Sequence, residues 1–364
     1  MRFPEFTGEW KKCKLSKVCS FFSGGTPPSS NKEYYNGNIP FIRSGELHND
    51  ETELFITKEG LDNSAAKMVE VGDLLLALYG ATSGDIAISK IKGAINQAIL
   101  CIRTKQNKKF VESVWNKHVA RLLQTYLQGG QGNLSADIVK NISFYFTNIE
   151  EQNKLARFIS LLDQHIAAQN KIIEDLKKLK SAISLKMLHS DSWEQFRIKD
   201  IAIIGRGRVI SSVEISQQKN PTYPVYSSQT SNEGIMGYLD DYMFEGEYIS
   251  WTTDGANAGT VFYRNGKFNC TNVCGLLKLK KGFDTHFVSL VLAEATKKYV
   301  SVNLANPKLM NNTMGNIQIR LPKLEEQKRI SIVFRRLHEL LAIHNNLLTE
   351  YSKQKQYLLS QMFI

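Results

Sequence analysis

Apolar side chains recur at alternating spacings of four and three residues in two long stretches of the chain. The first stretch runs from Leu155 to Met187 and the second from Ile330 to Met362. This is the a/d pattern of a coiled coil, so it predicts two long helices that pack on each other. The alternative interpretation is two separate amphipathic helices, each covering its own domain, although such helices rarely keep strict spacing over ten positions.

The a/d positions form the apolar seam of each predicted helix, and polar residues interrupt the two seams at the same places. These residues are Gln169 and Lys180 in the first helix and His344 and Lys355 in the second. If the helices pack antiparallel with polar layers aligned, Gln169 faces Lys355 and Lys180 faces His344. A shift of one heptad would place each polar side chain against an apolar one, which costs free energy unless it finds another partner. We therefore predict this register.

Between the two stretches the pattern changes to short apolar runs separated by turn residues. One amphipathic helix is predicted in each of these regions, at 110–127 and 287–299, and Asn265-Gly266 predicts a tight hairpin turn. Each region therefore has an α+β composition. The runs with strand character are Asp73–Gly80, Asp85–Ile91, Ala98–Thr104, Glu247–Thr253, Gly259–Gly266 and Cys274–Lys280.

The chain also repeats itself at a shift of 175 residues. Glu150-Glu151-Gln152 returns as Glu325-Glu326-Gln327, and Leu134 returns as Leu309. Asn148 is a predicted N-cap for the first helix, because acidic residues follow it in the first turn. A duplicated chain resembles a two-fold dimer joined covalently.

These patterns together predict an α+β fold with internal pseudo-two-fold duplication. Two globular units are expected to be separated by two long antiparallel coiled-coil helices. The predicted boundaries are residues 1–147 for the first unit, 148–190 for the first helix, 191–322 for the second unit and 323–364 for the second helix.

The composition indicates which class of partner the protein binds and in which cellular compartment it is expected. Lys and Arg number 46 against 35 Asp and Glu, a net charge of +11 that indicates a polyanion such as nucleic acid, or else scattered surface lysines. The five cysteines are dispersed without zinc-site spacing, so they are expected to be reduced thiols rather than metal ligands. Because the chain shows neither a signal-peptide pattern nor a membrane-spanning run, we expect a cytoplasmic protein without membrane contact.

Motifs for catalysis or cofactor binding are missing from the sequence. There is no P-loop, and Gly205–Ile210 lacks the third glycine of a dinucleotide fingerprint. Asn220–Tyr223 is a near match to the Asn-Pro-Pro-aromatic motif of amino-methyltransferases, but it lacks the second proline. We therefore predict no catalytic residue, no metal and no cofactor.

Polar loops in both regions carry side chains that suit base edges and phosphates. Ordinary solvent-exposed loops are the alternative for any one of them. The candidate DNA-contacting residues are Thr26, Ser29, Lys32, Arg43, Ser44, Ser83, Gln131, Asn133, Tyr226, Ser228, Gln229, Thr230, Asn257, Asn306 and Lys308.

The layout resembles the specificity subunit of type I restriction-modification systems. The resemblance rests on the duplicated variable region, the duplicated long helix, and the boundary segments Asn133–Ile159 and Lys308–Phe334. The start Phe3–Val18 also resembles that family. The first boundary departs slightly, with Thr147-Asn148 where the second has Pro322-Lys323, which leaves the architecture intact.

The resemblance implies a non-catalytic subunit that reads a bipartite site in double-stranded DNA. It also implies two methyltransferase subunits around the helical region and restriction-motor subunits in the full complex. A standalone DNA methyltransferase and a coiled-coil protein-interaction scaffold are the competing interpretations. The bases read and the spacer length depend on loop geometry that side-chain identity does not define.

Overall fold

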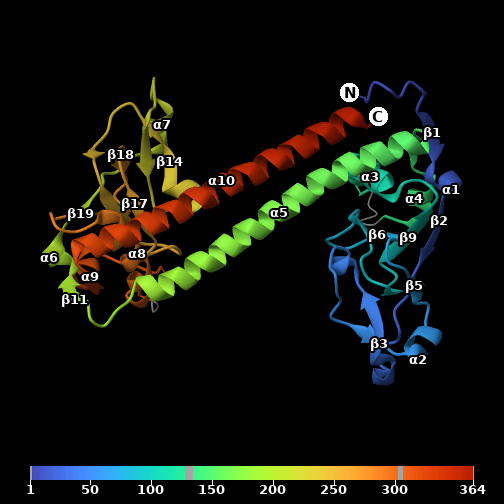
Figure 1. Ribbon diagram of the computed structural model, residues 1–364, viewed down its shortest axis with the longest axis horizontal. Helices are drawn as coiled ribbons and strands as arrows, with labels where there is room; N and C mark the ends of the chain where they lie inside the picture. Colours follow the sequence, from blue (N-terminus) through green and yellow to red (C-terminus); the bar gives the residue numbers. More distant parts are fainter. Residues whose placement is uncertain (1, 128–133, 302–305, 364) are drawn as a thin grey trace. The chain divides into compact units, whose positions relative to one another are not determined.

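The computed structural model describes residues 2–127, 134–301 and 306–363 (Figure 1). The chain divides into two compact units. Unit 1 comprises residues 1–171 together with 346–364, and unit 2 comprises residues 172–345. Each unit therefore contains one globular region and one part of each long helix.

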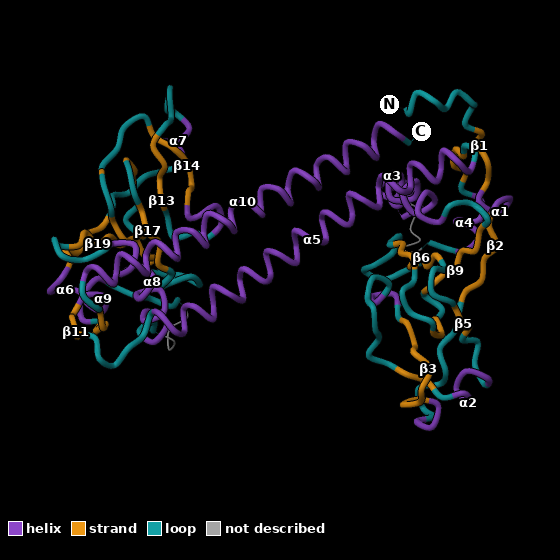
Figure 2. Tube along the Cα trace, in the orientation of Figure 1, coloured by secondary structure: helices purple, strands orange, loops and turns teal. Residues whose placement is uncertain are grey.

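The two predicted long helices are present as α5 (Ile149–Met187) and α10 (Leu324–Met362). Figure 2 shows both as continuous helical segments, with the strands confined to the globular regions. The predicted N-cap is confirmed, because the Asn148 Oδ1 accepts a hydrogen bond of 2.8 Å from the backbone N–H of Glu151. Such a cap satisfies one of the free N–H groups at the start of a helix.

The helices are antiparallel within each unit. In unit 1, Leu155 and Ile159 near the start of α5 share a core with Leu358 and Met362 near the end of α10. In unit 2 the opposite ends meet, since Ile183 and Met187 of α5 pack in the core that contains Ile330 and Phe334 of α10. Buried seam positions at both ends explain why the four-three spacing is kept.

The predicted register of the polar seam residues is wrong. Lys355 lies 2.6 Å from Asp163, six residues before its expected partner Gln169. Lys180 donates to the Nε2 of His338 at 2.6 Å, six residues before the expected His344. The shift is close to one heptad.

The physical reason is the length of the lysine side chains. A lysine at a seam position can bury its methylene groups and carry its ammonium to a polar residue beside the seam. Asp163 also receives Lys109 from α3 at 2.7 Å, so it is a ready counter-charge for Lys355. Matching polar layers is therefore unnecessary for satisfying these groups.

Unit 1 contains two four-stranded sheets, in the orders β2-β9-β6-β7 and β4-β3-β8-β5, and the pair β1-β10. Strands β3 and β8 are parallel, whereas the other pairs are antiparallel. The elements are β1 (Lys11–Lys14), α1 (Leu15–Val18), β2 (Cys19–Ser23), η1 (Lys32–Tyr34), β3 (Tyr35–Ile42), η2 (Ser44–Glu46), β4 (Phe55–Ile56), α2 (Lys58–Asp62), β5 (Lys67–Val69), β6 (Leu74–Ala77), β7 (Ile86–Ile88), β8 (Gly93–Ile95), β9 (Ile99–Thr104), α3 (Lys108–Leu127), α4 (Ala136–Asn141) and β10 (Ser143–Phe146).

Unit 2 repeats this topology, with sheets β12-β19-β16-β17 and β14-β13-β18-β15 and the pair β11-β20. The parallel pair is again in the same place, between β13 and β18. The elements are β11 (Glu194–Arg197), α6 (Ile198–Ile201), β12 (Ala202–Arg206), α7 (Ser212–Ser216), β13 (Tyr223–Tyr226), η3 (Ser231–Gly234), β14 (Ile235–Leu239), β15 (Phe244–Glu245), β16 (Tyr248–Thr252), β17 (Val261–Arg264), β18 (Lys267–Cys270), β19 (Cys274–Leu279), α8 (Thr285–Ala295), η4 (Thr296–Lys298), α9 (Asn311–Asn316) and β20 (Gln318–Leu321).

The hairpin prediction at Asn265-Gly266 is wrong in one respect. The chain turns there, with Gly266 at a φ of +99° that favours glycine. The flanking strands nevertheless do not pair, because β17 joins β16 in one sheet and β18 joins β13 in the other. The turn transfers the chain between sheets.

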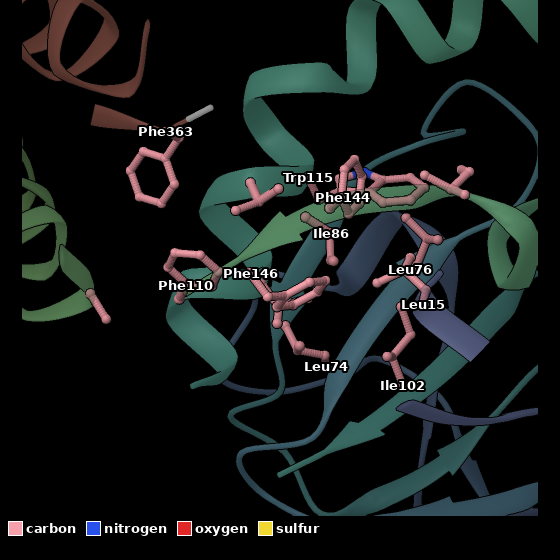
Figure 3. Packing of buried hydrophobic residues seen from close by; sticks show 14 of the residues in the cluster. Leu15, Leu74, Leu76, Ile86, Ile102, Phe110, Trp115, Phe144, Phe146 and Phe363 are labelled. Carbon is pink, nitrogen blue, oxygen red and sulfur yellow. The ribbon is translucent and has the colours of Figure 1, made fainter. Parts of the chain in front are cut away.

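The core of unit 1 forms where β-strands, α3 and the end of α10 meet (Figure 3). Trp115 of α3 is buried and its indole N–H donates to the carbonyl of Gly84 at 2.8 Å. Phe110 of α3 lies 5.5 Å from Phe363, measured between ring centroids. The long helices are thus built into the core of the globular region.

A buried glutamine joins each globular region to its long helix. In unit 1 the Gln152 side chain accepts from the N–H of Asn107, the N-cap position of α3, and donates to the carbonyl of Thr147 at 2.7 Å. In unit 2 the Gln327 side chain accepts from the N–H of Asp284, the N-cap of α8, and donates to the carbonyl of Pro322 at 2.8 Å.

The repeated Glu-Glu-Gln motif is explained by this joint. Gln152 is 0% exposed and Gln327 is 1% exposed, so neither amide has water as an alternative partner. A buried polar group without partners is costly, and each glutamine satisfies two backbone groups as well as itself.

We expect Gln327→Ala to destabilise unit 2 by about 2–4 kcal/mol, because two buried backbone groups lose their partners. Chemical denaturation followed by tryptophan fluorescence measures the change in the free energy of unfolding. Lys328→Ala, at the exposed neighbouring position, is the matched control and should have little effect. Equal effects of the two variants would contradict the role of the joint.

A histidine is also buried where α8 packs on α10. His286 is 3% exposed, and its Nδ1 lies 2.9 Å from the hydroxyl of Ser331. Burial, followed by the positive charges of Arg335 and His338, lowers the pKa of His286 to about 4, although Asp284 opposes the shift. The neutral imidazole is the form that the folded unit accommodates.

His286 should make stability fall as the pH drops from about 6.5 towards 4. In that window this histidine is protonated in the unfolded chain but not in the folded chain. The free energy of unfolding therefore falls by up to about 3 kcal/mol. His286→Gln should flatten this part of the curve of unfolding free energy against pH. His189→Gln, at an exposed histidine, should leave it unchanged. A His286→Gln curve that follows the parent protein would refute the assignment.

Candidate nucleic-acid interface

In unit 1 three polar loops meet around one short turn, residues 96–98, between β8 and β9. The N–H of Gly25 donates to the carbonyl of Ile95 at 3.2 Å, and the N–H of Leu78 donates to the carbonyl of Ala98 at 2.8 Å. Because β3 and β8 are parallel and Ile42 pairs with Ile95, the loop after β3 also begins beside this turn. We call residues 96–98 the junction turn of unit 1.

The side chain at the centre of this turn is part of the same cluster. The Thr26 hydroxyl donates to the Oε1 of Gln97 at 2.5 Å. Burial raises the pKa of Tyr79, and a hydrogen bond with Gln97 opposes that shift. Gln97 therefore links the loop before β3 to the loop after β6, while it is itself exposed.

Unit 2 has an equivalent junction turn, residues 271–273, between β18 and β19. The N–H of Thr271 donates to the carbonyl of Tyr226 at 2.9 Å, and the N–H of Thr253 donates to the carbonyl of Val273 at 3.2 Å. The loop after β13 thus lies on one side and the loop after β16 on the other. Asn272 is exposed in this turn, at the shift of 175 residues from Gln97.

A buried arginine holds the loop after β13. The φ angles of Asn232, Glu233 and Gly234 are 48°, 52° and 84°, an unfavourable left-handed stretch for the first two residues. The Arg264 guanidinium donates to the carbonyl of Glu233 at 2.8 Å and lies 3.6 Å from the centroid of the Tyr226 ring. Burial lowers the pKa of Arg264. Because this side chain is only 4% exposed, losing its hydrogen bonds and ring contacts would be costly.

The turns Gly80–Gly84 and Gly255–Gly259 connect adjacent strands tightly. The glycines at both ends of each turn have φ between +83° and +88°, and the N–H of Gly84 donates to the carbonyl of Ala77 at 2.9 Å. In unit 1 the Ser83 hydroxyl donates to the carbonyl of Leu78 at 3.0 Å, so it stabilises the turn. These contacts account for the two glycine-bounded turns as connections between strands.

In unit 2 this turn brings three candidate residues into one region. The N–H of Gly255 donates to the carbonyl of Pro307 at 3.0 Å, and Asp254 forms a β-bridge with Lys308. Asn257, Asn306 and Lys308 therefore lie near one another, and all three are exposed.

The remaining candidates differ in how available their side chains are. Thr26, Ser29, Lys32 and Thr230 are exposed, whereas Ser44, Tyr226 and Ser228 are half-buried. The Gln229 side-chain amide donates to the carbonyl of Ile235, so it closes its own loop. Gln131 and Asn133 lie outside the described residues.

Arg43 is held by two carboxylates in this structure. Its guanidinium lies 2.9 Å from Glu46 and 2.7 Å from Glu53. Burial would raise the pKa of Glu46, but hydrogen bonds from the Arg43 side chain and from the backbone N–H groups of Arg43 and Glu53 lower it to about 2. Contact between Arg43 and a base would require these ion pairs to open.

Gln97 and Asn272 are absent from the residues selected by sequence. Their signal was available in principle, because both are amide residues that stand just before a strand-like run and are related by the shift of 175. What the sequence does not contain is the convergence of three loops on that turn, which depends on the parallel strand pair.

Within the described ranges, no group of three or more His, Cys, Asp and Glu side chains gathers into a possible metal site. The same ranges contain no helix that is long and apolar enough to cross a membrane. The chemistry at the junction turns is that of amides, hydroxyls and lysines, which form hydrogen bonds and ion pairs.

A family model described as the type I restriction modification DNA specificity domain matches the chain twice, at residues 7–178 and 190–351. The chain belongs to this family. The two matches follow the internal duplication and cover nearly all of the sequence. The description of this family names DNA specificity.

Among curated relatives, the specificity subunit of the type I restriction enzyme MpnII from Mycoplasma pneumoniae is 45% identical over 141 residues. That match covers 38% of this chain and 42% of the relative. The chain spans about half the length of the curated relatives it matches.

Solved structures support the fold. The S subunit of a type I restriction-modification system from M. genitalium aligns with a TM-score of 0.73 and 16% identity, covering 98% of this chain and 96% of that one. A chain from a study of assembly and conformational transition of a type I system gives a TM-score of 0.54 and 14% identity, with 97% of both chains covered. The predicted fold class is thereby confirmed.

Proposed function

We propose that the two units read the two halves of a bipartite site in double-stranded DNA. The reading regions are residues 1–147 and 191–322, and the helical segments 148–190 and 323–364 set the spacing between the half-sites. The observation that carries this proposal is the repeated junction turn, surrounded in both units by polar loops on the same strand framework. Because the loop sequences differ, the two half-sites need not be the same.

Base reading is assigned to the side chains at the junction turns. An Asn or Gln amide can donate and accept together at an adenine edge in the major groove, which makes Gln97 and Asn272 suitable readers. Lys32 and Lys308, exposed in neighbouring loops, are suited to phosphates. With a net charge of +11, the affinity for DNA should fall steeply as salt concentration rises.

Partner binding is assigned to the long helices. Two methyltransferase subunits would bind there, and restriction-motor subunits would join in the full complex. Support comes from apolar side chains that the helices leave exposed, since such side chains on charged helices often mark protein contacts. They are Ile149, Leu161, Ile172, Leu179, Leu185, Ile332, Val333, Leu340, Ile343, Leu347 and Tyr357.

Replacing residues 1–147 by the corresponding region of another specificity subunit should change one half of the methylated sequence. The other half and the spacer should stay the same, because the second reader and both helices are retained. Methylation mapping of DNA from cells that carry the hybrid together with the methyltransferase subunits measures this. A change in both halves would contradict the assignment, and methylation without any sequence preference would remove the proposal.

Gln97→Ala and Asn272→Ala should each relax specificity in one half-site only. Loss of a two-hydrogen-bond contact to a base costs about 1–3 kcal/mol, which corresponds to roughly fivefold to 140-fold weaker discrimination. Competition binding with DNA carrying single-base changes in either half measures the effect. Lys105→Ala, at an exposed lysine outside the junction turns, is the control for a general loss of charge. If binding to all DNA sequences weakened equally, the two amides would contact the DNA backbone rather than the bases.

A further inference from the structure

In unit 1 the segment Arg2–Phe6 lies against the start of α5. The Arg2 guanidinium donates twice to the Glu151 carboxylate, at 2.7 Å to Oε1 and 2.6 Å to Oε2. The Glu151 side chain is fully buried by this arrangement, while that of Arg2 keeps 32% exposure. Bidentate arginine–carboxylate pairs of this kind are specific in geometry as well as favourable in energy.

The rest of the segment adds an aromatic contact and a second ion pair. The Phe3 ring packs edge-on against Phe158, with 6.2 Å between centroids. Lys154 lies over the Phe3 ring, with its Nζ 4.5 Å from the centroid, and forms an ion pair with Glu5. The segment therefore binds through an arginine, an adjacent aromatic ring and a carboxylate three positions after the arginine.

Unit 2 repeats the receiving charges without the segment. Glu326 and Arg329 stand at the shift of 175 residues from Glu151 and Lys154, so a carboxylate and a cation follow each other in the same order. Both side chains are exposed, and among the described residues neither has an ion-pair partner. Both line a groove of about 770 Å³, whose apolar part includes Trp193, Pro322 and Ile330.

The chain cannot fill this groove from the equivalent part of its own sequence. Trp193 corresponds to Trp10, but the residues before Trp193 continue from the end of α5, and Lys186 and Met187 form one wall of the groove. The described chain thus offers one Arg2–Phe6 segment and two receiving sites. Exchange of segments between copies of the chain would still leave one site empty for every copy.

We propose that the unit 2 groove binds an extended segment of a different protein with the chemistry of Arg2–Phe6. Its arginine pairs with Glu326, the adjacent aromatic ring packs on the apolar part of the groove, and a carboxylate three positions later pairs with Arg329. This binding requires no DNA, so it stands or falls separately from the proposed reading function.

The test uses a fluorescent peptide with the sequence of residues 2–6, acetylated at its N-terminus and titrated into the full chain without DNA. Fluorescence anisotropy should show saturable binding of one peptide per chain. Glu326→Gln should weaken binding about tenfold or more, because the peptide arginine loses its charged partner. Glu325→Gln is the matched control, since the Glu325 side chain is 81% exposed and does not line the groove.

A charge exchange gives the stricter test. Glu326→Arg should abolish binding of the original peptide and restore it for a peptide that carries glutamate in place of its arginine. Absence of saturable binding at millimolar peptide, or equal loss with Glu325→Gln, would overturn the proposal. Binding that depends on Glu151 and not on Glu326 would also overturn it, because the peptide would then be replacing the resident segment of unit 1.

Discussion

The buried glutamine at the start of each long helix is the interaction on which the rest of the molecule depends. It connects three parts that must be rigid with respect to one another within a unit: the long helix, the strand before it and the helix of the globular region. Because the amide is out of contact with water, its bonds cannot be exchanged for hydration. The polar loops therefore extend from a framework that is fixed to the helix.

Within each framework the loops share one meeting point and differ in their side chains. The parallel strand pairs β3/β8 and β13/β18 bring two loop starts to the same edge, and the junction turn follows directly. Unit 2 then adds Arg264, which holds a left-handed turn in place, whereas unit 1 uses the ion pairs of Arg43 in the corresponding loop. Different local solutions are thus built on one topology.

The sequence predicts those features that local periodicity determines. The four-three spacing predicts α5 and α10, the Asn148 cap follows from its position before two glutamates, and short apolar runs predict β6, β9, β16 and β19. The sequence does not predict features that depend on pairing between residues far apart in the chain. The Asn265-Gly266 turn joins strands that belong to different sheets. Lys180 pairs with His338, which lies beside the apolar seam of the helices. Gln97 lies where three loops meet only because parallel strands bring those loops to one edge.

The atoms that the two glutamines contact affect how the globular regions can be exchanged during evolution. Gln152 and Gln327 bind the main-chain N–H of Asn107 and Asp284 and the main-chain carbonyl of Thr147 and Pro322. Gln152 also donates to the side-chain Oε1 of Gln106 at 2.7 Å. The main-chain part of this joint therefore does not depend on which side chains the globular region carries at these positions. Under the proposed function, recombination at this boundary would exchange a whole reading region in one event rather than by stepwise substitution.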